Sequence, residues 1–413
     1  MSSNLTASAT SDLNMAAMTK QPLHLAQRLT AICMSLLATV VLAQSAANDS
    51  PDRVFKTELH TVRAISVVKG LYHPWSVAFL PDGRMLVTER RGTMRIVDGG
   101  KLVDKPIDGL PKATEHGQGG LLDVALHPKY AQNGWIYWTY NAGTPGEYGT
   151  ELSRGKLGGT RETPLMTNVE LLFQMQPKSA AQQHFGSRIV FDRQGYLYIT
   201  LGDRGDSPAK GSAHRAQQLN DHGGKSIRLH DDGRVPADNP FVKTPGARPE
   251  IFTWGNRNMQ GAALHPETGR VWAHEHGPQG GDEVNILTSG ANYGWPVITF
   301  GANYGSGTKI GEGTAKEGMV APLHVWVPSI APSGMAFYTA NNFPKWQGNL
   351  LVGALAHQSL VRLTLKGDKV VAEERMFEKQ LGRIRDVRQG PDGNVFLLTD
   401  APDGELIRLE AVK

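Results

Sequence analysis

Cysteine is almost absent from this sequence of 413 residues. The single cysteine, Cys33, lies inside an apolar run near the N-terminus. A disulfide framework and thiol chemistry are therefore excluded for the rest of the chain. Runs of lysine and arginine are also missing, and basic and acidic residues are interspersed although the formal net charge is +4. Without a basic patch or a basic–aromatic stripe, the sequence argues against a nucleic-acid partner.

Long hydrophobic runs are scarce, and the one at residues 29–43 has a specific setting. It follows the basic residues Lys20 and Arg28 and precedes three small residues. This order is typical of a secretory signal peptide, so we predict that residues 1–43 are a signal with its upstream residues and that 44–52 are a linker. A short membrane anchor is the alternative, but the run falls short of the ~20 residues that span a bilayer. We therefore expect a periplasmic or secreted protein without stable membrane insertion after cleavage.

Glycine, in contrast, is abundant at 47 residues, and a hairpin pattern recurs along the chain. In residues 79–87 a short apolar run, a turn of Pro81, Asp82 and Gly83, and a second apolar run follow one another. These turn residues pre-set φ or tolerate a left-handed φ, which favours a β-hairpin. Five looser copies lie at residues 124–140, 189–200, 262–274, 335–352 and 387–398.

Hairpins at this spacing predict an all-β, six-bladed β-propeller that occupies residues 53–413 as one domain. Residues 53–71 alternate in part between apolar and polar side chains, and we expect this strand to join the last blade and close the ring. Long inserts between blades are expected at 141–183, 202–249 and 293–332, because the spacing between the hairpin turns is uneven and is longest in the middle of the chain. Long loops in a compact domain are usually functional.

Polar residues are concentrated in the segments between the hairpins. His184 could accept a proton from an alcohol or simply bond to loop backbone, and Asp203 could be a functional carboxylate or an Asx-turn residue. Arg257 could belong to a site or to an inter-blade ion pair. Arg383 and Arg385 alternate on an expected strand, where two guanidiniums on one face call for an anion unless that face is solvated.

Four of these segments, in this order, resemble the soluble quinoprotein glucose/aldose sugar dehydrogenases. They are residues 184–203, 257–261, 276–296 and 383–386. The resemblance covers about residue 74 to the C-terminus. It implies a propeller that oxidises aldoses at the anomeric carbon to lactones by hydride transfer to pyrroloquinoline quinone (PQQ), assisted by calcium. The substrate would be a small-molecule sugar, and the electron acceptor is not identified by the sequence.

The resemblance also implies roles for single residues at the reacting end of the cofactor. His184 would be the base that takes the proton from the anomeric hydroxyl, and Asp203 would orient it. Arg257 and Asn258 would stabilise the negative charge that the quinone oxygen gains. Gln118 matches a residue that lines the pocket of sugar and cofactor. Asp282 and Trp295 are interpreted as structural.

Further residues match the family's binding groups for the cofactor carboxylates and for calcium. Arg383 and Arg385 would bind carboxylates of PQQ, which guanidiniums suit bidentately. Main-chain carbonyls of Gly277 and Pro278 match those that hold the catalytic calcium, which accepts such oxygens. The Glu283 carboxylate and the Tyr293 carbonyl resemble a second, structural calcium site.

One departure from the family pattern is Ala356, which stands where relatives carry a lysine that contacts the cofactor. His357 or Gln358 could replace it, or cofactor affinity could be lower. Two other functions therefore stay open on the same architecture. One is a metal-dependent lactonase with ligands such as Glu89, Asn258 and Asp203, and the other is a non-catalytic propeller that binds glycan or protein.

Overall fold

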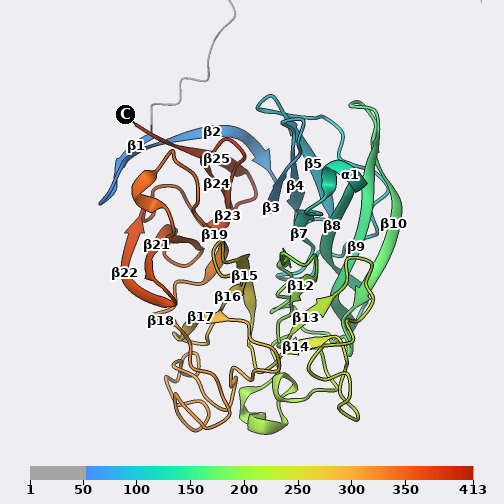
Figure 1. The fold of residues 1–413 in the computed structure, drawn as a ribbon, viewed down its shortest axis with the longest axis vertical. Helices are drawn as coiled ribbons and strands as arrows, with labels where there is room; N and C mark the ends of the chain where they lie inside the picture. Colours follow the sequence, from blue (N-terminus) through green and yellow to red (C-terminus); the bar gives the residue numbers. More distant parts are fainter. Residues whose placement is uncertain (1–52, 413) are drawn as a thin grey trace, which may run out of the picture. The chain divides into compact units, whose positions relative to one another are not determined.

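The hairpins expected from the sequence form the inner two strands of six sheets. The computed structural model describes residues 53–412, and Figure 1 shows its strands around a common axis. At the first turn, Gly83 has a φ of 89° and the Asp82 side chain accepts the N–H of Arg84 at 3.1 Å, which stabilises the tight reversal. The inner hairpins are β3 (Pro74–Phe79) and β4 (Met85–Glu89), β7 (Leu121–Leu126) and β8 (Trp135–Thr144), β11 (Ile189–Phe191) and β12 (Leu197–Thr200), β15 (Met259–Leu264) and β16 (Val271–Glu275), β19 (Pro332–Phe337) and β20 (Leu350–Ala354), and β23 (Ile384–Gln389) and β24 (Val395–Thr399).

Outer strands complete each antiparallel sheet, and the sheets form a closed ring. The outer strands are β5 (Thr93–Asp98), β6 (Lys101–Leu102), β9 (Glu147–Gly159), β10 (Pro164–Gln174), β13 (Ser226–Leu229), β14 (Ile251–Thr253), β17 (Asp282–Ile286), β18 (His324–Trp326), β21 (Ser359–Lys366) and β22 (Lys369–Met376). The innermost strands contact one another in the order β3, β7, β11, β15, β19, β23 and back to β3. The prediction of a six-bladed β-propeller is confirmed.

The ring is closed by strands from both ends of the described chain. The sixth sheet has five strands in the order β1 (Arg53–Lys56), β2 (Thr61–Leu71), β25 (Gly404–Ala411), β24 and β23. Figure 1 shows blue β2 beside red β25. The N-terminal strand therefore joins the last blade as the sequence predicted, and this pairing covers an edge that would otherwise bind another strand.

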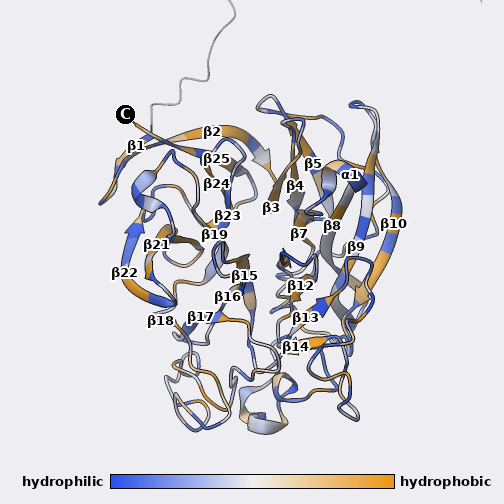
Figure 2. Cartoon of the chain, viewed as in Figure 1, coloured by the Kyte–Doolittle hydropathy of each residue, from blue (hydrophilic) through white to orange (hydrophobic). Residues whose placement is uncertain are grey.

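The prediction of a long insert at residues 141–183 is wrong, because most of this segment forms β-strands. Strands β8, β9 and β10 run through residues 135–174 as the three long strands of the second blade, and β9 and β10 are its outer pair. Figure 2 shows both hydrophobic and hydrophilic stretches on β10, and six of its eleven residues are exposed. Long loops lie at residues 201–225, 230–250 and 287–323. The first of them contains η1 (Pro208–Ala213) and η2 (Arg215–Gln217). Other helical turns are α1 (Tyr130–Asn133) and η3 (Pro344–Trp346).

Apolar layers lie between neighbouring sheets, whereas the axis of the ring is polar. One such layer packs Leu86 of β4 against Trp138 of β8, and both are fully buried. On the axis, Arg188 Nη1 lies 2.9 Å from Asp123 Oδ1 and 3.0 Å from Asp386 Oδ1. Arg388 pairs with the same two carboxylates. This balanced network of two cations and two anions ties β7, β11 and β23 together.

Residues 1–43 and 44–52, which the sequence predicts as signal and linker, lie outside the described residues. Within residues 53–412, no helix is long and apolar enough to cross a membrane.

Candidate active site

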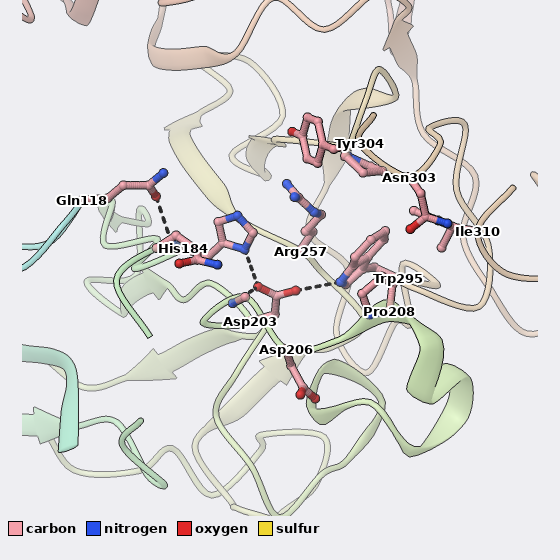
Figure 3. Close-up of a pocket in the computed structure, with 13 residues that line it drawn as sticks. Gln118, His184, Asp203, Asp206, Pro208, Arg257, Trp295, Asn303, Tyr304 and Ile310 are labelled. Atoms are coloured by element: carbon pink, nitrogen blue, oxygen red, sulfur yellow. Dashed lines mark hydrogen bonds and ion pairs between the residues drawn. The ribbon is translucent and has the colours of Figure 1, made fainter. Parts of the chain in front are cut away.

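A cavity of about 660 Å³ lies where loops from several blades meet (Figure 3). Its wall includes five residues that the sequence nominated, namely Gln118, His184, Asp203, Arg257 and Pro278. They are separated by up to 160 positions in the chain, and the loops after β12, β14 and β16 and before β7 and β11 bring them together. The loop 287–323 adds the rim residues Asn303 and Tyr304.

His184 and Asp203 form a hydrogen-bonded pair at the wall of this cavity. The distance from His184 Nδ1 to Asp203 Oδ1 is 2.6 Å, and Figure 3 shows the imidazole lying over the carboxylate. Asp203 also accepts the N–H of Gly205 at 2.8 Å and the indole N–H of Trp295 at 2.8 Å. Because a carboxylate only accepts, the shared proton belongs to His184 Nδ1 and the lone pair of the neutral ring is on Nε2.

The surroundings of the pair keep the imidazole neutral and the carboxylate charged. Burial lowers the pKa of His184, Asp203 partly offsets this effect, and the cations Arg257 and Arg204 lower it further. Burial alone would raise the pKa of Asp203. Its contacts with His184, together with the charges of Arg257 and His214, outweigh burial and hold the pKa of this carboxyl well below its usual range. A neutral histidine beside a charged carboxylate is the arrangement of a general base.

The backbone at His184 is unusual and is held by the neighbouring blade. His184 has a φ of 57°, a left-handed value that costs about 1–2 kcal/mol for a non-glycine residue. Gln118 Oε1 accepts the N–H of His184 at 3.0 Å, and the N–H of Gln118 donates to the carbonyl of Gln182 at 2.7 Å. Gln118 therefore supports the turn that carries the imidazole as well as lining the cavity.

Arg257 and Asn258, which were predicted to act together, have different positions in the structure. Arg257 lines the cavity and donates through Nη1 to the carbonyl of Gly277 at 2.6 Å. Asn258 does not line this cavity and is 1% exposed. Its Oδ1 accepts hydrogen bonds from the N–H of Gly186 at 3.2 Å and from the side-chain amide of Gln260 at 3.3 Å. Asn258 thus fixes backbone next to His184, whereas Arg257 is placed to meet a ligand.

A second cavity, of about 260 Å³, contains the other predicted arginine pair. Arg383 and Arg385 line it, and Gln118 lines both cavities, so the two spaces adjoin. Asp400 Oδ2 lies 3.3 Å from Arg383 and 3.0 Å from Arg385. The protein itself therefore supplies part of the negative charge that the two guanidiniums require. Arg90 also lines the space and is paired with Glu115 at 3.1 Å, so the wall carries three guanidiniums and one carboxylate, with Glu115 outside the wall. Burial lowers the pKa of Arg385, as expected for an incompletely neutralised cation. The donor set fits a ligand with several carboxylates.

The segment at Ala356, where relatives carry a lysine, contributes no cation to the second cavity. Ala356 is exposed, and neither His357 nor Gln358 lines the second cavity, whose wall in this segment is Leu355. Arg90, from the turn between β4 and β5, supplies the additional cation.

Calcium fits one of its two predicted sites better than the other. At the first, the carbonyl of Gly277 already accepts the hydrogen bond from Arg257, so an ion there would compete with the guanidinium for this oxygen. At the second, Glu283 and Tyr293 line a small cavity of about 10 Å³ together with Glu275. This is room for about one water-sized species.

The carboxylates of that second site carry an electrostatic signature of a cation site. Glu275 and Glu283 are register partners on β16 and β17. Burial raises the pKa of Glu275 to about 7, and burial together with the charge of Glu275 raises the pKa of Glu283 well above its usual range. A cation between them would restore both charges, and carboxylate and carbonyl oxygens are the ligands calcium prefers.

The ligand set proposed for a lactonase does not converge. Glu89 accepts hydrogen bonds from Tyr72, Arg91 and Thr93 within its own blade region, and it lines neither of the two cavities. In residues 53–412, no three histidine, cysteine or acidic side chains are grouped to hold a metal ion.

Sequence and structure comparisons agree with these features. The family model described as glucose/sorbosone dehydrogenase matches residues 71–408. The aldose sugar dehydrogenase YliI of Escherichia coli strain K12 is 45% identical over 343 residues, covering 82% of this chain and 90% of the relative.

Solved structures give the same picture. The apo-form of the soluble aldose sugar dehydrogenase from Escherichia coli is 43% identical with a TM-score of 0.80, covering 85% of this chain and 100% of that one. The PQQ-bound form of the aldose sugar dehydrogenase from Streptomyces coelicolor is 27% identical with a TM-score of 0.69, covering 86% and 100%. The resemblance that the motifs indicated is confirmed, and this chain belongs to the glucose/sorbosone dehydrogenase family.

Proposed function

We propose that this protein is a quinoprotein sugar dehydrogenase that oxidises aldoses at the anomeric carbon to lactones, with PQQ as cofactor. The observation that supports it most is the adjacency of the two cavities through Gln118. This adjacency sets the His184–Asp203 pair beside a space lined by Arg90, Arg383 and Arg385. The aldose sugar dehydrogenase from Streptomyces coelicolor, whose structure is a PQQ-bound form, supports the choice of cofactor.

In this proposal the protein supplies a base, its partner and a set of fixed cations. PQQ, when bound, supplies a quinone that accepts the hydride leaving the anomeric carbon. His184 Nε2 takes the proton of the anomeric hydroxyl, so loss of one hydride and one proton leaves the C=O bond of the lactone. Asp203 stabilises the imidazolium that results, and Arg257 stabilises the negative charge that develops in the cavity.

The arginines of the second cavity bind rather than react. Arg385 and Arg383 would hold carboxylates of the cofactor, with Arg90 in place of the absent lysine. Calcium would be held best by Glu283, Glu275 and the carbonyl of Tyr293. We also propose export through the segment 1–43, a periplasmic or secreted location, and transfer of the electrons to an unidentified acceptor.

Reconstitution of the purified protein tests this function directly. With PQQ and calcium added, we expect reduction of an artificial dye by aldoses and formation of a lactone. Neither should occur without PQQ, and a chelator should lower the rate. Quinone binding without turnover on a broad sugar panel would instead support the non-catalytic propeller, and lactone hydrolysis without quinone would support the lactonase.

The pH dependence of sugar oxidation should follow the state of His184. Its pKa is lowered from the usual 6.5, and the base works only while it is neutral. We therefore expect kcat/KM to stay constant on lowering the pH through 6.5 and to fall only at more acidic pH, where the imidazole takes up a proton. A loss of kcat/KM on acidification with its midpoint above pH 6.5 would contradict the assignment of His184 as the base.

A further inference from the structure

Arg204, the residue after Asp203, is a buried cation with an unusual set of contacts. It is 2% exposed, and its guanidinium carbon lies 3.4 Å from the centre of the Phe185 ring. Its two terminal nitrogens donate to the main-chain carbonyls of Gln183 and Ala181. The guanidinium thus contacts the turn that carries His184 in two ways, through hydrogen bonds to its backbone carbonyls and through the ring of Phe185.

We propose that Arg204 is a positioning residue for His184, a role that rests on the proposed function. Arg204 holds the turn 181–185 in the conformation in which His184 Nδ1 is hydrogen-bonded to Asp203 and Nε2 faces the cavity. The sequence motif around Asp203 offers no role for this arginine. Its function follows only from where the folded chain places its guanidinium.

The turn needs such a restraint because its backbone is strained. Within the turn, His184 has a φ of 57°, and just outside it Ser187 and Arg204 have φ values of 99° and 56°. Strained conformations of this kind persist only where surrounding contacts fix them. Gln118 grips the turn through the N–H of His184, and Arg204 grips it through the carbonyls on the preceding side.

Packing against Phe185 completes the restraint from a second direction. A Cβ on Gly119 would lie 2.5 Å from the Phe185 ring, so the ring is in close contact with the glycine backbone. The ring is thereby held between the backbone of one loop and the guanidinium of another. Movement of Arg204 would release Phe185 and, with it, the adjacent His184.

Arg204 also acts on His184 through its charge. In residues 53–412 no carboxylate forms an ion pair with Arg204, and its buried Nε has no hydrogen-bond partner. Burial lowers the pKa of Arg204 to about 9. The charged groups that face His184 are Asp203, which favours the imidazolium, and Arg257 and Arg204, which disfavour it. His276 also faces it, but burial lowers the pKa of His276 to about 3, so this side chain is neutral. Loss of the Arg204 charge should therefore make His184 easier to protonate.

Three variants separate this role from a purely structural one. Arg204→Met removes the charge and both carbonyl contacts but keeps an apolar chain against Phe185. Arg204→Lys keeps the charge and loses the planar fork that binds two carbonyls at once. Arg228→Met is the matched control, because Arg228 is also buried and lies over an aromatic ring, 3.8 Å from the centre of Tyr196, in β13.

The main measurement is the pKa of His184 by NMR in the cofactor-free protein, with the signal assigned by its absence in His184→Asn. We expect Arg204→Met to raise this pKa by about one unit, and Arg228→Met to leave it unchanged. Arg204→Lys should keep the pKa within a few tenths of a unit. In the reconstituted enzyme, Arg204→Met and Arg204→Lys should both lower kcat about 10- to 100-fold, with little change in KM.

The proposal is overturned if Arg204→Met lowers only the melting temperature and leaves both the His184 pKa and kcat unchanged. If Arg204→Met does not fold, Arg204→Lys decides the matter, since a kcat equal to wild type would exclude a role for the fork. Should the wild-type protein oxidise no sugar at all, the proposed function fails, but the NMR titration still shows whether Arg204 controls His184.

Discussion

Replacing His184 with asparagine is expected to lower kcat/KM for an aldose by about 10³-fold, because general-base catalysis contributes 10² to 10⁴ and the amide cannot replace it. Asparagine is the appropriate substitution because it is among the few residues that tolerate a left-handed φ, and His184 has a φ of 57°. The turn should therefore keep its shape. PQQ binding should be retained, since the arginines of the second cavity are untouched.

Two further variants make this experiment specific. Asp203→Asn should cost a similar factor, because its amide offers a donor to His184 Nδ1 and favours the tautomer with the proton on Nε2. His116→Asn is the control, since His116 stacks on Tyr148 at 4.2 Å and does not line the cavity. It should keep the wild-type rate within about threefold. A His184→Asn enzyme as fast as wild type would rule out His184 as the base.

The inner hairpins could be predicted from the sequence because their signals are local. Each depends on a few adjacent residues, such as Pro81, Asp82 and Gly83, which fix the reversal without help from the rest of the chain. The outer strands β9 and β10 were missed for the opposite reason. Residues such as Val169 and Leu171 are exposed on an outermost strand, so no clean alternation marks them as half-buried.

The site was predicted only where a motif identified it. His184, Asp203 and Arg257 stand in recognisable segments, and they do line one cavity. Trp295 donates to Asp203 across 92 positions, and nothing near either residue indicates that contact. The sequence reading therefore took Trp295 as structural, whereas it lines the cavity.

The arginine pair shows how a correct physical argument can remain incomplete. Two guanidiniums so close together did require an anion, as the spacing of Arg383 and Arg385 implied. Part of that anion is Asp400, just after β24, which reaches both guanidiniums. A further cation of the cavity wall, Arg90, comes from another blade. Asp400 reaches the pair through the pairing of β23 with β24 in the same blade, whereas Arg90 arrives only through ring closure, which no local pattern encodes.

The second large effect is expected from Arg385→Met, which should weaken PQQ binding by about 100-fold or more. Truncating one partner of a buried charge pair costs about 2–5 kcal/mol, partly because the other charge is left unpaired. Here Asp400 would remain in the cavity with one partner fewer and would repel an anionic ligand. Titration of the cofactor-free protein with PQQ, followed by tryptophan fluorescence, measures the change in Kd without requiring turnover.

Arg383→Met should weaken binding less, by about tenfold or below, because its side chain is 47% exposed whereas that of Arg385 is 13% exposed. Asp400→Asn should act in the opposite direction and tighten PQQ binding, since it removes the one carboxylate that lines the cavity. Arg375→Met is a control, because Arg375 pairs with Glu373 at the surface of β22. The order of the four variants is the sharp part of the prediction. Equal losses for Arg383→Met and Arg385→Met, or weaker binding by Asp400→Asn, would mean that the ligand carboxylates do not enter this cavity.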